Sequence, residues 1–173
     1  RFAALLNQSL NTDYNFKLKQ FLKNDFLKIK NFCFDQIYKN FNKKDIYIKL
    51  KRSKQILHPA DLGFHNALRT KDNIFFLDFE YFGWDDPVKL ISDFYWHPGM
   101  QIKFNLKKYW YSKASSIFND NELNKRLKYC LNLYGLRWAL IILNDFRVTI
   151  KTLNQRKTNK VYFNKQLLKS KKI

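Results

Sequence analysis

Hydrophobic side chains recur at three- and four-residue intervals along much of the chain. In residues 24–41 the opposite face carries lysine and asparagine, and the apolar positions are Phe26, Ile29, Cys33, Ile37 and Phe41. This spacing predicts an amphipathic helix that starts at Asn24-Asp25. A shorter helix is expected after the capping residues 11–13.

The second half of the chain shows the same helical spacing. It predicts helices over residues 102–118, 121–134 and 136–153. Gly135 stands between the last two, and we expect it to separate or kink them, because glycine weakens a helix interior.

The pattern changes in the middle of the chain. The segments NALRT (66–70) and NIFFLDF (73–79) are typical of two short strands joined by a tight turn. We expect the aromatic side chains of residues 75–84 to pack in a core. Residues 46–50, IYIKL, fit either a short strand or the end of a helix.

A further helix is expected directly after this hairpin. Asp86-Pro87 combines an acidic cap with proline in the first turn, and His97-Pro98-Gly99 marks the end. The expected fold class is therefore α+β and mainly α, with one small central β-hairpin.

The chain is strongly basic, with 33 Lys and Arg against 14 Asp and Glu and a formal net charge of +19. Such a charge suits nucleic acid, an anionic membrane or a phosphorylated ligand. The lysines are nevertheless spread along the chain among many asparagines and phenylalanines, which indicates a general compositional bias. Only the end of the chain is dense in basic residues, so we divide it into residues 1–155 and a basic tail, residues 156–173.

Other sequence features narrow the class of protein. No apolar run approaches the length of a membrane span, and the first ten residues lack the layout of an export signal. Cys33 and Cys130 fall within helical patterns and are interpreted as core thiols, which suits a cytoplasmic protein. The spacing of His58, His65 and His97 does not suggest a metal site, and we interpret them as loop and surface residues.

Three polar side chains flank the predicted hairpin: Asp61, Asn66 and Asp78. Phosphoryl transfer needs a carboxylate that orients or deprotonates the attacking hydroxyl, together with Mg²⁺ held by a few oxygen ligands. In protein kinases an asparagine follows the catalytic aspartate by five residues, and a second aspartate begins a D-F-G triplet. Asp61 and Asn66 have that spacing, and Asp78-Phe79-Glu80 stands where the triplet is expected.

The block HPADLGFHNAL…IFFLDFEYFGWDDP resembles the aminoglycoside phosphotransferase and choline kinase superfamily. Its pattern reads H-G-D-x-x-x-x-N, then a strand ending I-D-[FW]-E, then a G-x-x-D-P helix start, and the resemblance covers about residues 50–147. It implies the C-terminal lobe of a protein-kinase-like fold, ATP as phosphoryl donor and a small hydroxylated molecule as acceptor. The identity of the acceptor, and ATP against GTP, are left open.

The resemblance also implies roles for individual residues. Asp61 would be the catalytic base or the group that orients the substrate hydroxyl. Asn66 and Asp78 would bind Mg²⁺ and, through it, the nucleotide phosphates. Glu80 would belong to the metal shell or contact substrate, whereas Asp86 would cap the following helix.

Two departures from the superfamily pattern matter. The histidine expected two places before the base is Pro59 here, and His58 lies one position early. The N-terminal β-lobe that covers the phosphates finds no room before Asp61, because residues 11–41 are expected to be helical. We therefore expect the chain to be the catalytic lobe alone, inactive in isolation.

The alternative is a catalytically degenerate kinase-like module or a basic nucleic-acid-binding protein. Nucleic acid is the weaker alternative, because clustered carboxylates repel phosphate unless a cation intervenes.

Overall fold

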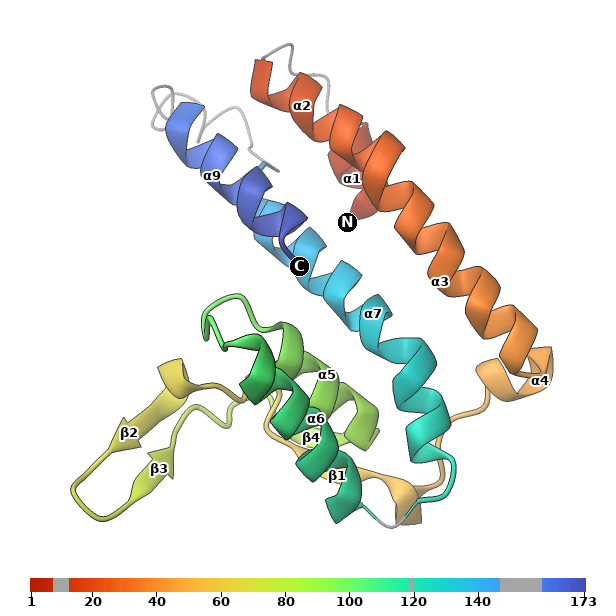
Figure 1. Ribbon diagram of the computed structural model, residues 1–173, viewed down its shortest axis with the longest axis vertical. Helices are drawn as coiled ribbons and strands as arrows, with labels where there is room; N and C mark the ends of the chain where they lie inside the picture. Colours follow the sequence, from red (N-terminus) through yellow and green to blue (C-terminus); the bar gives the residue numbers. More distant parts are fainter. Residues whose placement is uncertain (8–12, 119, 147–159) are drawn as a thin grey trace. The chain divides into compact units, whose positions relative to one another are not determined.

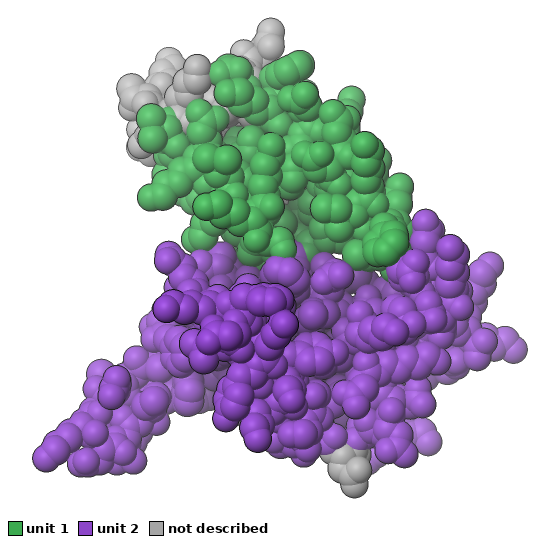
Figure 2. Space-filling model, viewed as in Figure 1, with its two compact units in different colours: residues 1–34, 136–173 green, residues 35–135 purple. Residues whose placement is uncertain are grey.

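The computed structural model describes residues 1–7, 13–118, 120–146 and 160–173 (Figure 1). These residues are mainly helical and include two small antiparallel sheets, so the expected α+β, mainly helical class is confirmed. The chain forms two compact units (Figure 2): unit 1 comprises residues 1–34 and 136–173, and unit 2 comprises residues 35–135.

Unit 1 is helical throughout its described residues. Its elements are α1 (Phe2–Leu6), α2 (Asp13–Phe21), a π-helical turn (Leu22–Phe26), the first part of α3 (Leu27–Asn40), the last part of α7 (Leu123–Ile142), a 3₁₀ turn (Leu143–Phe146) and α9 (Lys160–Lys171). The expected helix start at Asn24-Asp25 is wrong. The helix continues through the π-helical turn, in which Leu22 and Phe26 are both buried.

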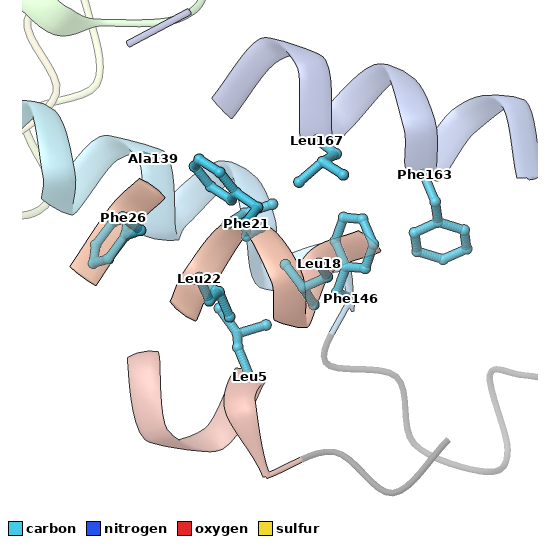
Figure 3. Packing of buried hydrophobic residues seen from close by; sticks show 10 residues of the cluster. Leu5, Leu18, Phe21, Leu22, Phe26, Ala139, Phe146, Phe163 and Leu167 are labelled. Atoms are coloured by element: carbon cyan, nitrogen blue, oxygen red, sulfur yellow. The ribbon is translucent and has the colours of Figure 1, made fainter. Parts of the chain in front are cut away.

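The core of unit 1 consists of leucine and phenylalanine side chains from these helices (Figure 3). The buried set is Leu5, Leu18, Phe21, Leu22, Phe26, Ala139, Leu143, Phe146, Phe163 and Leu167. Phe163 and Leu167 lie on α9, within the segment interpreted as a basic tail. The described part of that segment is thus a helix that packs Phe163 and Leu167 into the core of unit 1, which includes residues 136–173.

Unit 2 has a separate core. The helices of unit 2 include α4 (Lys43–Ile46), α5 (Pro87–Trp96), α6 (Phe104–Ile117) and the first part of α7. Val88 and Ile91 of α5 are buried there, and the other members are Ala114, Leu123 and Leu127. Residues 46–50 do not form a strand. Ile46 is the last residue of α4, and a turn follows it.

The expected interruption at Gly135 is wrong, because α7 runs through it without a break. A Cβ at this position would stand only 3.0 Å from Cε2 of Trp96. The glycine therefore allows α7 to approach the Trp96 ring closely, a constraint that the local sequence does not reveal. Residues 147–153 of the expected final helix lie outside the described residues.

Residues 56–85 of unit 2 form two antiparallel sheets, and along the chain the strands of one lie between the strands of the other. β2 (Ala67–Arg69) pairs with β3 (Ile74–Phe76), which confirms the expected hairpin. β1 (Ile56–His58) pairs with β4 (Gly83–Asp85), and the sequence did not predict this second pair. The outer pair closes the segment that contains the whole hairpin.

The hairpin projects from the rest of unit 2 (Figure 2). The large apolar side chains from β3 to β4 are 41–81% exposed, in contrast to the expected core packing; they include Phe75, Phe76, Phe79, Tyr81, Phe82 and Trp84. None of the helices in the described residues has the length and apolar character that a membrane crossing requires.

An ion-pair network supports the start of α5. Asp86 caps the helix, because its Oδ1 accepts a hydrogen bond from the Val88 N–H at 2.9 Å, as expected. Arg126 donates to Asp86 Oδ2 at 2.9 Å and to Asp120 Oδ2 at 2.7 Å. Lys54 donates to Asp120 Oδ1 at 2.9 Å.

This network makes the stability of the chain depend on pH. Burial disfavours the charged carboxylate, but Lys54 and Arg126 outweigh it and lower the pKa of Asp120 to about 2. Since the folded pKa is below the ordinary value of 3.8, Asp120 stabilises the fold above pH 4 and loses that contribution as the pH falls towards 2. We expect Asp120→Asn to lower the free energy of unfolding at pH 7 by on the order of 1 kcal/mol.

The measurement is denaturant unfolding between pH 7 and pH 2. The difference between the parent chain and Asp120→Asn should narrow as the pH falls. Asp72→Asn, which removes an exposed carboxylate at the hairpin turn, is the control. An Asp120→Asn difference that is constant over the whole range would contradict the ion-pair account.

Candidate functional site

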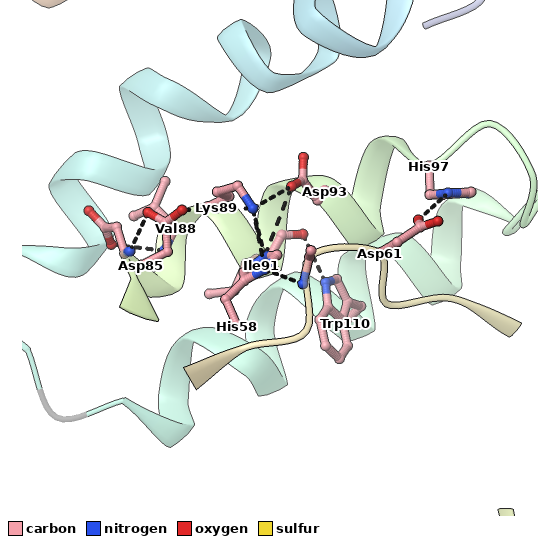
Figure 4. A network of polar contacts seen from close by, with 11 residues as sticks. His58, Asp61, Asp85, Val88, Lys89, Ile91, Asp93, His97 and Trp110 are labelled. Atoms are coloured by element: carbon pink, nitrogen blue, oxygen red, sulfur yellow. Dashed lines mark hydrogen bonds and ion pairs between the residues drawn. The ribbon is translucent and has the colours of Figure 1, made fainter. Parts of the chain in front are cut away.

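A buried histidine fixes the loop that carries Asp61. His58 ends β1 and is only 2% exposed, so its interpretation as a surface residue is wrong. Its Nδ1 accepts a hydrogen bond from the Ala60 N–H at 2.8 Å. Lys89 Nζ lies 3.3 Å from the same Nδ1 and 3.5 Å from Asp93 Oδ2 (Figure 4). His58 thus holds the residue directly before Asp61, although it lies one position earlier than the superfamily pattern places its histidine.

The backbone at Ala60 is strained. Its φ is 57°, in the left-handed region that side chains other than glycine rarely adopt. The superfamily pattern has glycine at this position. Ala60 keeps this conformation because β1 and the His58 hydrogen bond constrain the residues before it.

Asn66 links the Asp61 loop to the hairpin. Its side-chain Nδ2 donates to the backbone oxygen of Asp61 at 3.0 Å. Its own backbone oxygen accepts a hydrogen bond from the Leu77 N–H at 2.8 Å, which extends the β2–β3 pairing by one step. Since the amide nitrogen is engaged, the carboxamide oxygen is the atom with which Asn66 can bind a cation.

Asp78 follows the backbone partner of Asn66 directly. Its φ is 62°, a left-handed conformation that aspartate tolerates better than most residues. The side chains of Asp78 and Glu80 are exposed at the base of the hairpin. The backbone hydrogen bond joins Asn66 to the residue before Asp78, and a shared role of the two side chains stays a prediction.

Two histidines lie against the Asp61 carboxylate. His97 Nε2 is 3.1 Å from Oδ1, and His65 Nε2 is 3.3 Å from Oδ2 (Figure 4 shows the Asp61–His97 contact). The two imidazoles stack with their centroids 4.4 Å apart and their planes 18° apart. In the described part of the chain these three residues form the group of His, Cys, Asp or Glu side chains whose ligand atoms converge, and Asp78 and Glu80 do not belong to it.

Sequence reasoning missed this grouping. In the sequence His65 follows Asp61 by four residues, but His97 lies beyond α5, and the local sequence indicates only that it is part of a helix end. Asp61 and His97 are 36 residues apart in the sequence, so local patterns do not predict their contact. The pairing of β1 with β4 and the direction of α5 bring the two segments together.

The histidines also change the electrostatics of Asp61. Partial burial disfavours its charged form, but the hydrogen bonds and the electrostatic interaction with His65 and His97 outweigh this and lower the pKa of Asp61 below its usual value. At neutral pH Asp61 is therefore a carboxylate that accepts hydrogen bonds, and it is a weaker base than an isolated aspartate.

No protein-family model, curated protein or solved structure matches this chain. The kinase-like assignment stays a prediction from the residues quoted above, and the roles of Asp61, Asn66, Asp78 and Glu80 stay predictions with it.

We expect Ala60→Gly to stabilise the chain by about 0.5–1 kcal/mol, because glycine adopts a positive φ without strain. The measurement is denaturant unfolding at pH 7. Ala67→Gly is the matched control, since Ala67 has an ordinary extended conformation with φ −127° and should lose stability on the same change. Equal losses in both variants would mean that Ala60 is not strained.

Proposed function

We propose that this chain takes part in Mg²⁺-dependent phosphoryl transfer from ATP to a hydroxyl group of a small molecule. The observation that supports this most is the position of Asn66. One side-chain hydrogen bond ties it to Asp61, and one backbone hydrogen bond ties it to the residue before Asp78. These two hydrogen bonds connect the segment of the Asp61 carboxylate with the segments of the two candidate oxygen ligands, Asn66 and Asp78.

Asp61 is suited to orient the attacking hydroxyl. A carboxylate oxygen accepts a hydrogen bond from the hydroxyl and directs its oxygen towards the phosphorus. The lowered pKa favours this orienting role over strong base catalysis. Phosphoryl transfer tolerates a weak base, because its transition state depends more on positioning and electrostatics than on early proton removal.

Asn66 and Asp78 provide the donor atoms that Mg²⁺ prefers. A carboxamide oxygen and a carboxylate are hard ligands, and Mg²⁺ commonly binds through one or two protein groups plus phosphates and water. When bound, Mg²⁺ neutralises negative charge on the phosphate oxygens. Glu80, which is exposed and lies two residues beyond Asp78, is the third candidate oxygen donor.

The exposed apolar hairpin fits a catalytic lobe that works together with another part. Exposed aromatic clusters of this extent commonly mark a contact surface. In the described residues no β-rich lobe precedes Asp61, so in this proposal the group that covers the nucleotide phosphates lies outside them.

A second candidate function is a catalytically degenerate binding module. It is favoured by the two histidines, because both carboxylate oxygens of Asp61 already accept an imidazole N–H contact. A substrate hydroxyl must displace one of these before Asp61 can orient it.

The test measures transfer by the full-length protein, with a panel of hydroxylated metabolites. We expect Asp61→Ala to lower the transfer rate by at least about 100-fold while nucleotide binding changes by no more than about twofold. Asp78→Asn should abolish Mg²⁺-dependent nucleotide binding, because it removes the charged ligand.

Asp72→Asn is the control for both variants, since it removes a carboxylate from the same hairpin at the turn. Transfer that survives both Asp61→Ala and Asp78→Asn would refute the proposal. Nucleotide binding without transfer to any acceptor, unchanged by Asp61→Ala, would favour the degenerate module.

A further inference from the structure

A second possible site is the group formed by the Asp61 carboxylate and the imidazoles of His65 and His97. Phosphoryl transfer does not require the two imidazoles. The carboxylate follows β1, His65 lies in the 3₁₀ turn Phe64–Asn66, and His97 follows the last residue of α5. All three lie in unit 2, and their ligand atoms are within 4.8 Å of one another.

Two glycines fit closely around the imidazoles. A Cβ at Gly63 would stand 2.4 Å from Cε1 and 2.5 Å from Nδ1 of His65, a distance that no real side chain tolerates. A Cβ at Gly99 would stand 3.0 Å from Cε1 of His97. Gly63 has an extended backbone, with φ −172°, that any residue could adopt, so it is the ring of His65 and not the backbone that requires glycine there.

The distances suit a metal ion with bonds to nitrogen and oxygen. A tetrahedral ion with bonds of about 2.0–2.1 Å holds its ligand atoms about 3.3 Å apart. The two Asp61–histidine contacts measure 3.1 and 3.3 Å. The three ligand atoms lie within 4.8 Å of one another, so an ion that binds them replaces these hydrogen bonds and requires the two imidazoles to turn out of their parallel stack.

We propose that Asp61, His65 and His97 bind a divalent ion of the Zn²⁺ class through three protein ligands, with the remaining positions open to water or an anionic ligand. Imidazole nitrogens select borderline transition metals, whereas Mg²⁺ prefers oxygen donors. This site therefore differs in chemistry from the oxygen site at Asn66 and Asp78. The proposal concerns binding and does not rest on phosphoryl transfer.

Metal binding has a cost at His97. The Gly99 N–H donates to His97 Nδ1 at 3.1 Å, so in the metal-free chain the proton of the neutral ring is on Nε2. An ion at Nε2 requires that proton to move to Nδ1, and the Gly99 hydrogen bond is lost. A neutral hydrogen bond contributes little net stability compared with a metal bond, so this cost lowers the affinity without preventing binding.

Occupation of this site would affect Asp61 directly. An ion bound to the carboxylate removes the acceptor that a substrate hydroxyl would use. If the chain takes part in phosphoryl transfer, Zn²⁺ is then an inhibitor that acts at Asp61 and leaves the Mg²⁺ ligands untouched.

The test is a titration of the metal-free 173-residue chain with Zn²⁺ by calorimetry, and with Co²⁺ by visible absorption. We expect one ion per chain, and we expect His65→Asn and His97→Asn each to weaken Zn²⁺ binding by at least about tenfold. Gly63→Ala should weaken it as well, because it keeps all three ligands but displaces the ring of His65. An excess of Mg²⁺ should not compete.

Asp78→Asn is the matched control and should leave the Zn²⁺ affinity unchanged. The far-ultraviolet circular dichroism of each variant verifies folding, and His65→Asn alone carries the test should His97→Asn fail to fold. Absence of binding by the parent chain, or equal affinity in the histidine variants, overturns the proposal. Loss of transfer in Asp78→Asn with retained Zn²⁺ binding separates the two sites.

Discussion

The pairing of β1 with β4 brings His58 opposite Gly83 and closes the whole of the loop and hairpin between them. Each strand has only three residues, so its backbone hydrogen bonds alone would not hold so long a segment. The buried His58, the Lys89–Asp93 pair and the cap at Asp86 support the pairing from α5. Asp61, His65, Asn66 and Asp78 lie within the segment that this pairing closes, and His97 contacts Asp61 from the end of α5.

The elements that the sequence predicted are those whose signals are local. α5 begins at Pro87, directly after its Asp86 cap, and ends at Trp96, because a cap and a proline mark one end and His-Pro-Gly marks the other. The β2–β3 hairpin follows from two short apolar runs around a polar turn. The backbone hydrogen bond between Asn66 and Leu77 continues the same hairpin register.

The missed features depend on contacts between distant segments. β1 and β4 are too short to show a periodicity, and only their pairing makes them strands. The local sequence predicts a helix break at Gly135, whereas the close approach of the Trp96 ring explains why α7 has a glycine at this position. The aromatic run of the hairpin has the composition of a core strand, and composition alone does not tell whether another surface covers it.

The two roles assigned to Asp61 depend on the same two oxygens. To orient a hydroxyl, one oxygen must exchange a histidine for the substrate, and the other histidine still holds the carboxylate in place. To bind a metal ion, the carboxylate must face both imidazoles together, which keeps a hydroxyl away. His65 lies four residues after Asp61, whereas His97 follows a separate helix, so the contact between Asp61 and His97 joins two segments that are distant along the chain. The hydrogen bond from Gly99 to His97 fixes the imidazole to its own loop.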